Sequence, residues 1–211
     1  MQTAYANGGS TAYLREGLGL PVALTPTGVK HLHRAAQAFD VGVYWEANGH
    51  GTVLLGPAAQ AAAERAGRAP WARDVSALLR MVNQAVGDAL SGVLLAECLL
   101  RRLGWTFADW AALYAELPSR QAVLRVRDRG VIATADAETR CVAPEGLQAA
   151  VDAAVARHAC GRAFVRPSGT EDVVRVYAEA ATREACDALT LEVLRAVHRL
   201  AGGLGDAPEG L

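Results

Sequence analysis

The sequence predicts two folded units, a partial α/β mixed-sheet domain followed by a small antiparallel-sheet α+β domain with two helices. The N-terminal half alternates short β-prone runs with helical segments, as α/β units do. The C-terminal part instead places strand-like runs around turn signals and carries two amphipathic helices. The change falls near Pro118, so we expect units at residues 1–117 and 118–211.

Composition argues against several classes of protein. The 211 residues include 21 basic and 22 acidic side chains, without the basic excess of nucleic-acid or membrane-surface proteins. No apolar run reaches the length of a membrane span, and no secretory signal is visible at Met1. The four cysteines show no CxxC spacing, so we expect buried thiols in a reducing compartment and no zinc site. We therefore expect a cytoplasmic protein with neither nucleic acid nor membrane as a partner.

The first segment, to about residue 55, is expected to alternate strand, helix, strand and helix. Residues 3–6 should end a strand and residues 7–11 should form a turn and a helix N-cap. Residues 20–24 have the composition of a second strand, and helical spacing follows to Phe39. Because a unit this small leaves sheet edges open, and its first strand lies at Met1, we expect the chain to begin inside a domain.

A hairpin with polar groups at its tip follows at residues 39–55. The tip is Glu46-Ala47-Asn48-Gly49-His50-Gly51. Glu46 can accept hydrogen bonds from sugar hydroxyls, and Asn48 can both donate and accept them. His50 could donate to a hydroxyl or phosphate, or exchange a proton near neutral pH. An alternative is that Asn48-Gly49 is only a favourable hairpin turn and His50 a surface residue.

The middle of the chain is predicted to be helical. Residues 57–70 are expected to form an exposed helix or a linker, and apolar residues from 71 to 103 fall at helical spacing with an interruption at 87–89. Thr106 should cap a short helix. Trp105, Trp110 and Tyr114 are interpreted as core residues.

The C-terminal unit should contain a strand at 121–126, turns near 128–130 and 134–138, and a helix that opens near Pro144. A strand at 164–165 leads into a polar loop, and residues 173–180 form the strand that runs back from it. Thr182 should then cap a final helix, which ends at Gly202-Gly203.

The polar loop of this unit has the chemistry of a phosphate site. Arg166 and Arg175 offer planar, permanently charged forks. Ser168 and Thr170 add hydroxyl donors, and Gly169 lets backbone N–H groups approach an anion. Pro167 stiffens the entry. An ordinary polar hairpin turn is the alternative.

The run RPSGTEDVVRVYAEA resembles the phosphate-binding loop of the α-D-phosphohexomutase superfamily in its phosphoacetylglucosamine mutase form, and EANGHG resembles the sugar-recognition loop. TGVKHLH, from Thr27 to His33, and NQAVGDALSG also match. The resemblance implies that residues 1–117 are the C-terminal part of the family's third, sugar-recognition domain with a helical connection. It also implies that residues 118–211 are the fourth, phosphate-binding domain, a four-stranded antiparallel sheet with two helices. The substrate-binding residues that it implies are Glu46, Ala47, Asn48, His50, Arg166, Pro167, Ser168, Gly169, Thr170 and Arg175. Lys30 and His31 are second-rank candidates, and His33 is expected on the helix surface.

The family interconverts N-acetylglucosamine 6-phosphate and N-acetylglucosamine 1-phosphate on the route to UDP-N-acetylglucosamine. Its chemistry needs a phosphoserine in a TASHNP-like motif and Mg²⁺ in a DGDADR-like motif, and neither motif occurs in this sequence. We therefore expect a C-terminal portion that binds sugar phosphate without catalytic residues or metal ligands of its own. One alternative is a free-standing, non-catalytic sugar-phosphate-binding module. Another is a regulatory partner of a full-length mutase.

Overall fold

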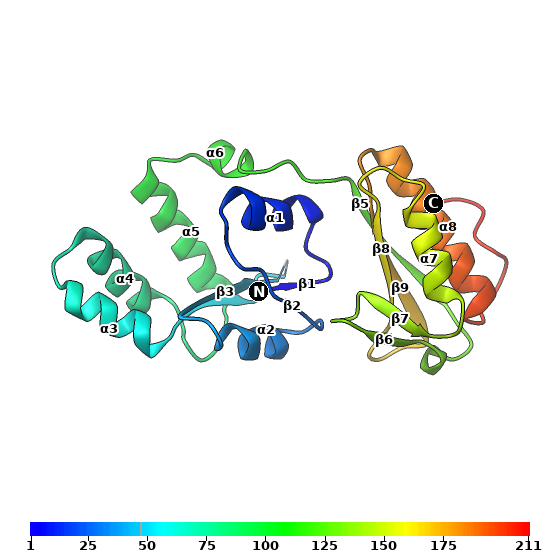
Figure 1. Cartoon of the computed structure of the whole chain (residues 1–211), viewed down its shortest axis with the longest axis horizontal. Helices are drawn as coiled ribbons and strands as arrows, with labels where there is room; N and C mark the ends of the chain where they lie inside the picture. Colours follow the sequence, from blue (N-terminus) through cyan, green and yellow to red (C-terminus); the bar gives the residue numbers. More distant parts are fainter. Residues whose placement is uncertain (47) are drawn as a thin grey trace. The chain divides into compact units, whose positions relative to one another are not determined.

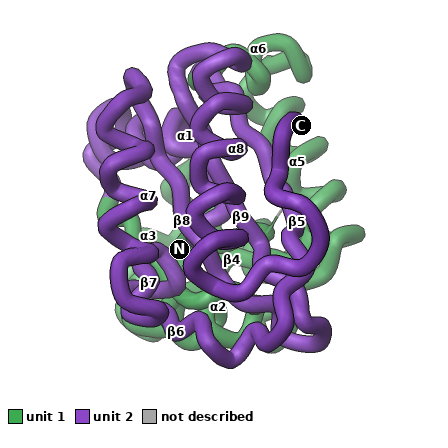
Figure 2. Tube along the Cα trace, turned by 90° about the vertical axis from the view of Figure 1, so that its right-hand side faces the viewer, with its two compact units in different colours: residues 1–3, 21–114 green, residues 4–20, 115–211 purple. Residues whose placement is uncertain are grey.

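A computed structural model describes residues 1–46 and 48–211 and contains two compact units (Figures 1 and 2). Unit 1 comprises residues 1–3 and 21–114, and unit 2 comprises residues 4–20 and 115–211. The sequence had assigned residues 4–20 to the N-terminal unit. Within the described residues, none of the helices combines the length and apolar character that a membrane crossing requires.

Unit 1 contains two small sheets. β1 (Gln2–Thr3) and β2 (Leu24–Thr25) pair in parallel, and β3 (Val41–Trp45) pairs antiparallel with β4 (Gly51–Leu55). The helix α2 (Val29–Ala36) packs against β3, where Leu32 and Tyr44 are fully buried. β2 is shorter than the predicted strand at 20–24. Pro21 has no backbone N–H to donate, which disfavours strand pairing at the start of that run.

The middle of the chain is largely helical, as predicted, but the interruption expected at residues 87–89 covers residues 82–88. The helices are α3 (Pro57–Ala66), α4 (Pro70–Met81), α5 (Ala89–Leu103) and α6 (Phe107–Ala111). Pro residues start α3 and α4, where a missing N–H costs nothing. Asp88 caps α5 through the Ser91 backbone N–H at 2.7 Å, and Thr106 and Asp109 form a capping box on α6.

The expectation that Trp105 and Trp110 lie in a core is wrong. They are 39% and 46% exposed and line an apolar concavity of about 210 Å³ with leucines of α5. Tyr114 is half-buried. Helical spacing correctly indicates an apolar face, but it does not indicate whether the chain itself covers that face.

Unit 2 is built on a three-stranded antiparallel sheet in the order β5-β9-β8, with bounds Ser119–Arg125, Val173–Glu179 and Arg162–Pro167. β6 (Ala133–Ala135) and β7 (Arg140–Ala143) form a separate hairpin, so the structure has a three-plus-two arrangement in place of one four-stranded sheet. The helices α7 (Leu147–Val155) and α8 (Arg183–Leu200) lie on one face of the sheet (Figure 1). Thr182 caps α8 by accepting from the Ala185 N–H, as predicted.

The two faces of the sheet differ in chemistry because side chains alternate along a strand. One face sends Val165, Val174 and Val176 into the core beneath α7 and α8. The other face carries three cross-strand pairs between β8 and β9. They are Arg162 with Glu179, Phe164 with Tyr177, and Arg166 with Arg175.

The second face also holds the N-terminal segment of unit 2. Arg162 and Glu179 form a two-pronged ion pair with distances of 2.8 and 3.0 Å. The Arg162 guanidinium also donates to the carbonyls of Ala4 (2.8 Å) and Ala6 (2.7 Å), and Glu179 accepts from the N–H of Gly8 at 3.1 Å. These contacts dock the chain that leads into α1 (Gly8–Ala12) and the following π-helical turn, Tyr13–Gly17.

The ion pair is held in its charged form. Burial alone would raise the pKa of the Glu179 carboxyl, but the hydrogen bonds and charge of Arg162 outweigh it, with help from Tyr177 and Gly8, so this pKa is lowered. Burial raises the pKa of Tyr177, and the hydrogen bond it donates to Glu179 at 2.7 Å raises it further.

Replacing Glu179 with Gln should lower the free energy of unfolding by about 2 kcal/mol. The cost is below the 3–5 kcal/mol of a fully buried pair because Arg162 keeps some contact with water. Denaturant unfolding measures it, and the exposed Glu209→Gln is the matched control. Equal stability of both variants and the wild type would contradict this assignment.

The lowered pKa of Glu179 predicts that the free energy of unfolding depends on pH. A lowered pKa in the folded state means that Glu179 stabilises the fold above its unfolded pKa and loses this effect as pH falls through the folded pKa. Below about pH 4.3, the usual glutamate pKa, the wild type should therefore lose stability more steeply than Glu179→Gln. Parallel acid profiles of the two proteins would argue against a charged pair.

Candidate functional site

The polar loop of unit 2 connects β8 to β9. The Ser168 N–H donates to the Val173 carbonyl at 2.9 Å and closes the loop. Ser168 is only 5% exposed, and its hydroxyl accepts from the Thr170 N–H at 3.4 Å. Gly169 and Thr170 are exposed at the tip, and Pro167 pairs with Val174 at its base. The structure thus brings these predicted residues together in one hairpin, while their role stays a prediction.

The two arginines of this hairpin lie directly opposite each other. Arg166 and Arg175 are cross-strand partners, so their side chains leave the same face of the sheet. Like charges in this position destabilise a sheet unless a negative group lies between or beside them. Arg175 is exposed, whereas the Arg166 side chain is only 16% exposed and lies over the ring of Tyr5, 6.0 Å from its centroid.

A carboxylate missed by the sequence analysis lies beside Arg166. The Glu138 carboxylate is 3.3 Å from Arg166 Nε. Glu138 belongs to the β6–β7 turn, where Asp136, Ala137 and Glu138 all have left-handed backbone angles, with φ of 51°, 57° and 68°. Such angles cost about 1–2 kcal/mol for each residue other than glycine. The sequence indicates this turn, but nothing in it indicates that the turn reaches Arg166.

The predicted sugar loop of unit 1 joins β3 to β4. The Glu46 N–H donates to the His50 carbonyl at 2.9 Å, and the His50 N–H donates to the Asn48 side-chain oxygen at 2.9 Å. The Asn48 amide nitrogen lies 3.5 Å from a Glu46 carboxylate oxygen. Asn48 therefore also shapes the turn, which was the alternative interpretation. Ala47 lies outside the described residues.

A concavity of about 410 Å³ in unit 1 is lined by Lys30, His50 and Tyr44, among others. Lys30 and His50 thus line the same concavity, whereas His31 does not line it. His33, expected on the helix surface, is half-buried and its Nδ1 lies 3.0 Å from the Tyr44 hydroxyl. Burial raises the pKa of this hydroxyl, and the charge of Glu46 adds to the shift. Tyr44 is thus the hydrogen-bond partner of His33, which the sequence did not indicate.

Residues 83–87 contact β4 and so support the sugar loop. The Gln84 side chain accepts from the Leu55 N–H at 3.0 Å and donates to the Val53 carbonyl at 2.7 Å, which completes the edge of β4. A Cβ at Gly87 would lie 2.7 Å from the backbone of Gly51. Residues 83–87 therefore hold the β3–β4 hairpin in place.

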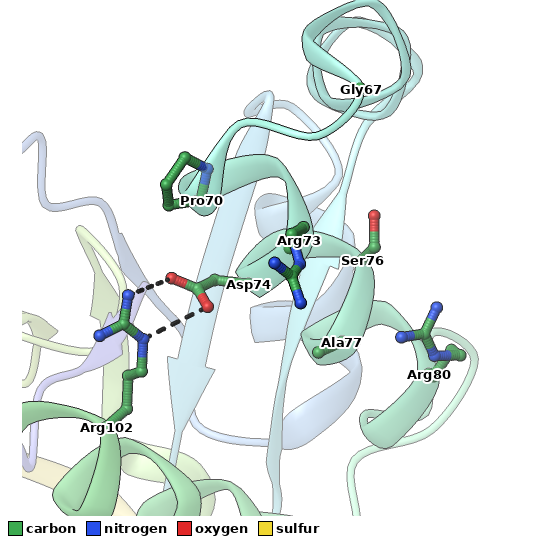
Figure 3. A pocket seen from close by; sticks show the side chains of 8 residues that line it. All are labelled: Gly67, Pro70, Arg73, Asp74, Ser76, Ala77, Arg80 and Arg102. Atoms are coloured by element: carbon green, nitrogen blue, oxygen red, sulfur yellow. Dashed lines mark hydrogen bonds and ion pairs between the residues drawn. The ribbon is translucent and has the colours of Figure 1, made fainter.

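A second, more basic concavity of about 530 Å³ lies between α4 and α5 (Figure 3). Arg73 and Arg80 lie on α4, and Arg102 of α5 is paired with Asp74 at 3.2 Å. All three arginines are exposed. Exposed charges of this kind are mostly solvated, so we do not assign a site here.

The described residues contain no cluster of metal-ligating side chains, and two of the four cysteines are buried. Among them, no three His, Cys, Asp or Glu side chains converge as metal ligands, so they do not fit a Mg²⁺ site. Cys141 and Cys186 are buried as expected, whereas Cys98 and Cys160 are exposed. Burial raises the pKa of Cys141 to about 11, which keeps it protonated.

Comparison with known proteins gives matches along most of the chain. Residues 1–105 match the family model "Phosphoacetylglucosamine mutase AMG1, domain III", and residues 115–196 match "Phosphoglucomutase/phosphomannomutase, C-terminal domain". Phosphoacetylglucosamine mutase of Mus musculus is 50% identical over 99% of this chain and 40% of its own length. The human protein is likewise 50% identical over 99% of this chain.

Solved structures extend the likeness to three dimensions. Aspergillus fumigatus N-acetylphosphoglucosamine mutase, in complex with GlcNAc-6P and magnesium, has a TM-score of 0.92 at 48% identity, covering 95% of this chain and 38% of that one. An N-acetylglucosamine-phosphate mutase in a substrate complex has a TM-score of 0.86 at 44% identity, covering 91% of this chain and 37% of that one.

The fold and these matches identify the chain as part of a member of the α-D-phosphohexomutase superfamily. Within it, the chain belongs to the phosphoacetylglucosamine mutase family, and it matches the part of that family that carries domain III and the C-terminal domain. The chain spans about 40% of the length of the curated relatives that it matches.

Replacing Gly87 with Ala should displace the sugar loop and lower the free energy of unfolding of unit 1 by about 1–3 kcal/mol, because the new Cβ overlaps the Gly51 backbone. Amide NMR shifts of Gly49 and His50, followed with thermal unfolding, measure both effects. The control is Gly210→Ala, whose Cβ meets open space. Unchanged shifts at Gly49 and His50 would mean that this segment does not support the loop.

Proposed function

We propose that this chain supplies sugar-phosphate binding in a phosphoacetylglucosamine mutase, which interconverts N-acetylglucosamine 6-phosphate and N-acetylglucosamine 1-phosphate in cytoplasmic UDP-N-acetylglucosamine synthesis. The observation that carries the proposal is the Arg166–Arg175 pair at the end of the β8–β9 hairpin. Two guanidinium groups on one face, beside a loop with two hydroxyl groups, match the charge and geometry of a phosphate.

The phosphate would bind at the tip of this hairpin. Arg166 and Arg175 would donate charge-assisted hydrogen bonds, each contributing about 1.5–3 kcal/mol. The Thr170 hydroxyl and the exposed backbone at Gly169 would add donors. Ser168 is largely buried and its hydroxyl already accepts a hydrogen bond, so it contributes mainly by shaping the loop. Pro167 fixes the base of the hairpin.

The sugar would be recognised by the β3–β4 loop. The Asn48 side-chain oxygen accepts from the His50 N–H, so the Asn48 amide nitrogen and the Glu46 carboxylate, which lie 3.5 Å apart, are the groups that would bind sugar hydroxyls. His50 and Lys30 share a concavity and could contact hydroxyl or phosphate oxygens. Ala47 and His31 keep the role that the family resemblance implies for them, as a loop residue and a second-rank candidate.

These residues bind and orient the substrate through hydrogen bonds and form no covalent bond to it. Binding energy from a non-reacting phosphate and a fixed sugar ring places the reacting oxygen accurately, which lowers the entropic part of the barrier. Mg²⁺ is present with the Aspergillus relative, but the described residues here do not fit it. We therefore assign the metal and the phosphoserine to the part of the full-length relatives that this chain does not match.

Calorimetric titration of the purified chain with N-acetylglucosamine 6-phosphate tests the proposal. Arg166→Ala and Arg175→Ala should each weaken binding about ten- to a hundredfold, since each removes a charge-assisted contact. Arg199→Ala, an exposed arginine of α8, is the matched control and should leave affinity unchanged. Equal affinity of all four proteins would refute the phosphate loop.

A mutase assay on the same preparation separates binding from catalysis. We expect binding without turnover. Turnover by the isolated chain would show that this chain holds catalytic groups that our assignment places elsewhere.

A further inference from the structure

Arg166 already has an anionic partner before any phosphate arrives. The Glu138 carboxylate lies 3.3 Å from Arg166 Nε, and the two side chains are only 22% and 16% exposed. Arg166 Nε is buried and has no well-aligned hydrogen bond, so the contact is a charge pair. Shielding from water makes such a pair stronger than a surface salt bridge.

The position of Glu138 is set by its backbone. It is the third of three consecutive left-handed residues, and the Thr139 N–H closes the turn on the Asp136 carbonyl at 3.2 Å. Asp136 in the same turn offers a contrast, because its side chain is 70% exposed and lies 3.9 Å from Arg140. The turn therefore directs one carboxylate to solvent and the other to the phosphate loop.

We propose that Glu138 is an internal counter-anion that competes with phosphate for Arg166 and so lowers the affinity of the β8–β9 loop for phosphate. The inference rests on the proposed function, because it assumes that the loop binds phosphate. With Glu138 in place, Arg166, Arg175 and Glu138 carry a net charge of +1, and without it the two arginines carry +2. Glu138 also repels the incoming phosphate, since both are negative.

This arrangement sets the lifetime of the complex. A ligand phosphate must share the Arg166 guanidinium with Glu138, whose carboxylate lies 3.3 Å from Nε. Because affinity differences between related complexes lie mostly in the dissociation rate, weaker binding means mainly faster release. Glu138 thus favours turnover of the bound ligand over its retention.

Glu138→Gln tests the inference, because it keeps the length of the side chain and the strained turn while removing the charge. We expect N-acetylglucosamine 6-phosphate and inorganic phosphate to bind at least fivefold more tightly, measured by calorimetry on the whole chain. The affinity should also depend more steeply on salt concentration, which a purely structural role would not change. Asp136→Asn is the matched control and should behave as the wild type.

The outcomes separate this inference from the proposed function. If the wild type binds phosphate, Arg166→Ala binds it more weakly, and Glu138→Gln binds it as the wild type does, the counter-anion is refuted and the loop stands. Weaker binding by Glu138→Gln refutes it as well and makes Glu138 a residue that positions Arg166. If wild type and Arg166→Ala bind equally, the proposed loop itself fails.

Discussion

The ion pair between Arg162 and Glu179 holds together the face of unit 2 on which the phosphate loop lies. It docks residues 4–8 through three backbone groups. Docking places Tyr5 against Phe164 and Tyr177, with ring centroids 5.0 and 5.9 Å away. The Arg166 guanidinium in turn lies over the ring of Tyr5. A structural ion pair and a candidate binding arginine are therefore linked through one tyrosine.

The register of β8 and β9 is the second constraint. It places each arginine of the loop on the face opposite to α7 and α8, and each inward valine in the core. A slip by one residue would exchange the two sets and bury charged groups beneath the helices. The hydrophobic core thus determines where the phosphate loop presents its charge. The same register sets two like charges opposite each other, and this local cost is what a bound anion, or Glu138, offsets.

Local patterns in the sequence predict much of this structure, and long-range contacts account for what they miss. Thr182 and Thr106 are confirmed as caps, and the hairpins with their polar tips form where turn residues indicate. The docking of residues 4–20 on unit 2 was missed because Glu179 and Gly8 are far apart in the chain. The contacts of Gln84 and Glu138 were missed for the same reason, since their partners Leu55 and Arg166 lie far from them in the chain. The exposure of Trp105 and Trp110 shows that helical spacing does not report what covers an apolar face.

The most direct test of the central claim is amide and arginine side-chain NMR of the ¹⁵N-labelled chain during titration with inorganic phosphate. The account predicts that the largest shift changes fall on the amides of Ser168, Gly169 and Thr170 and on the Nε–H groups of Arg166 and Arg175. It also predicts small changes at Arg73, Arg80 and Arg102, whose concavity we interpret as solvated surface. Largest changes at those three arginines, or no change in the β8–β9 loop, would contradict it.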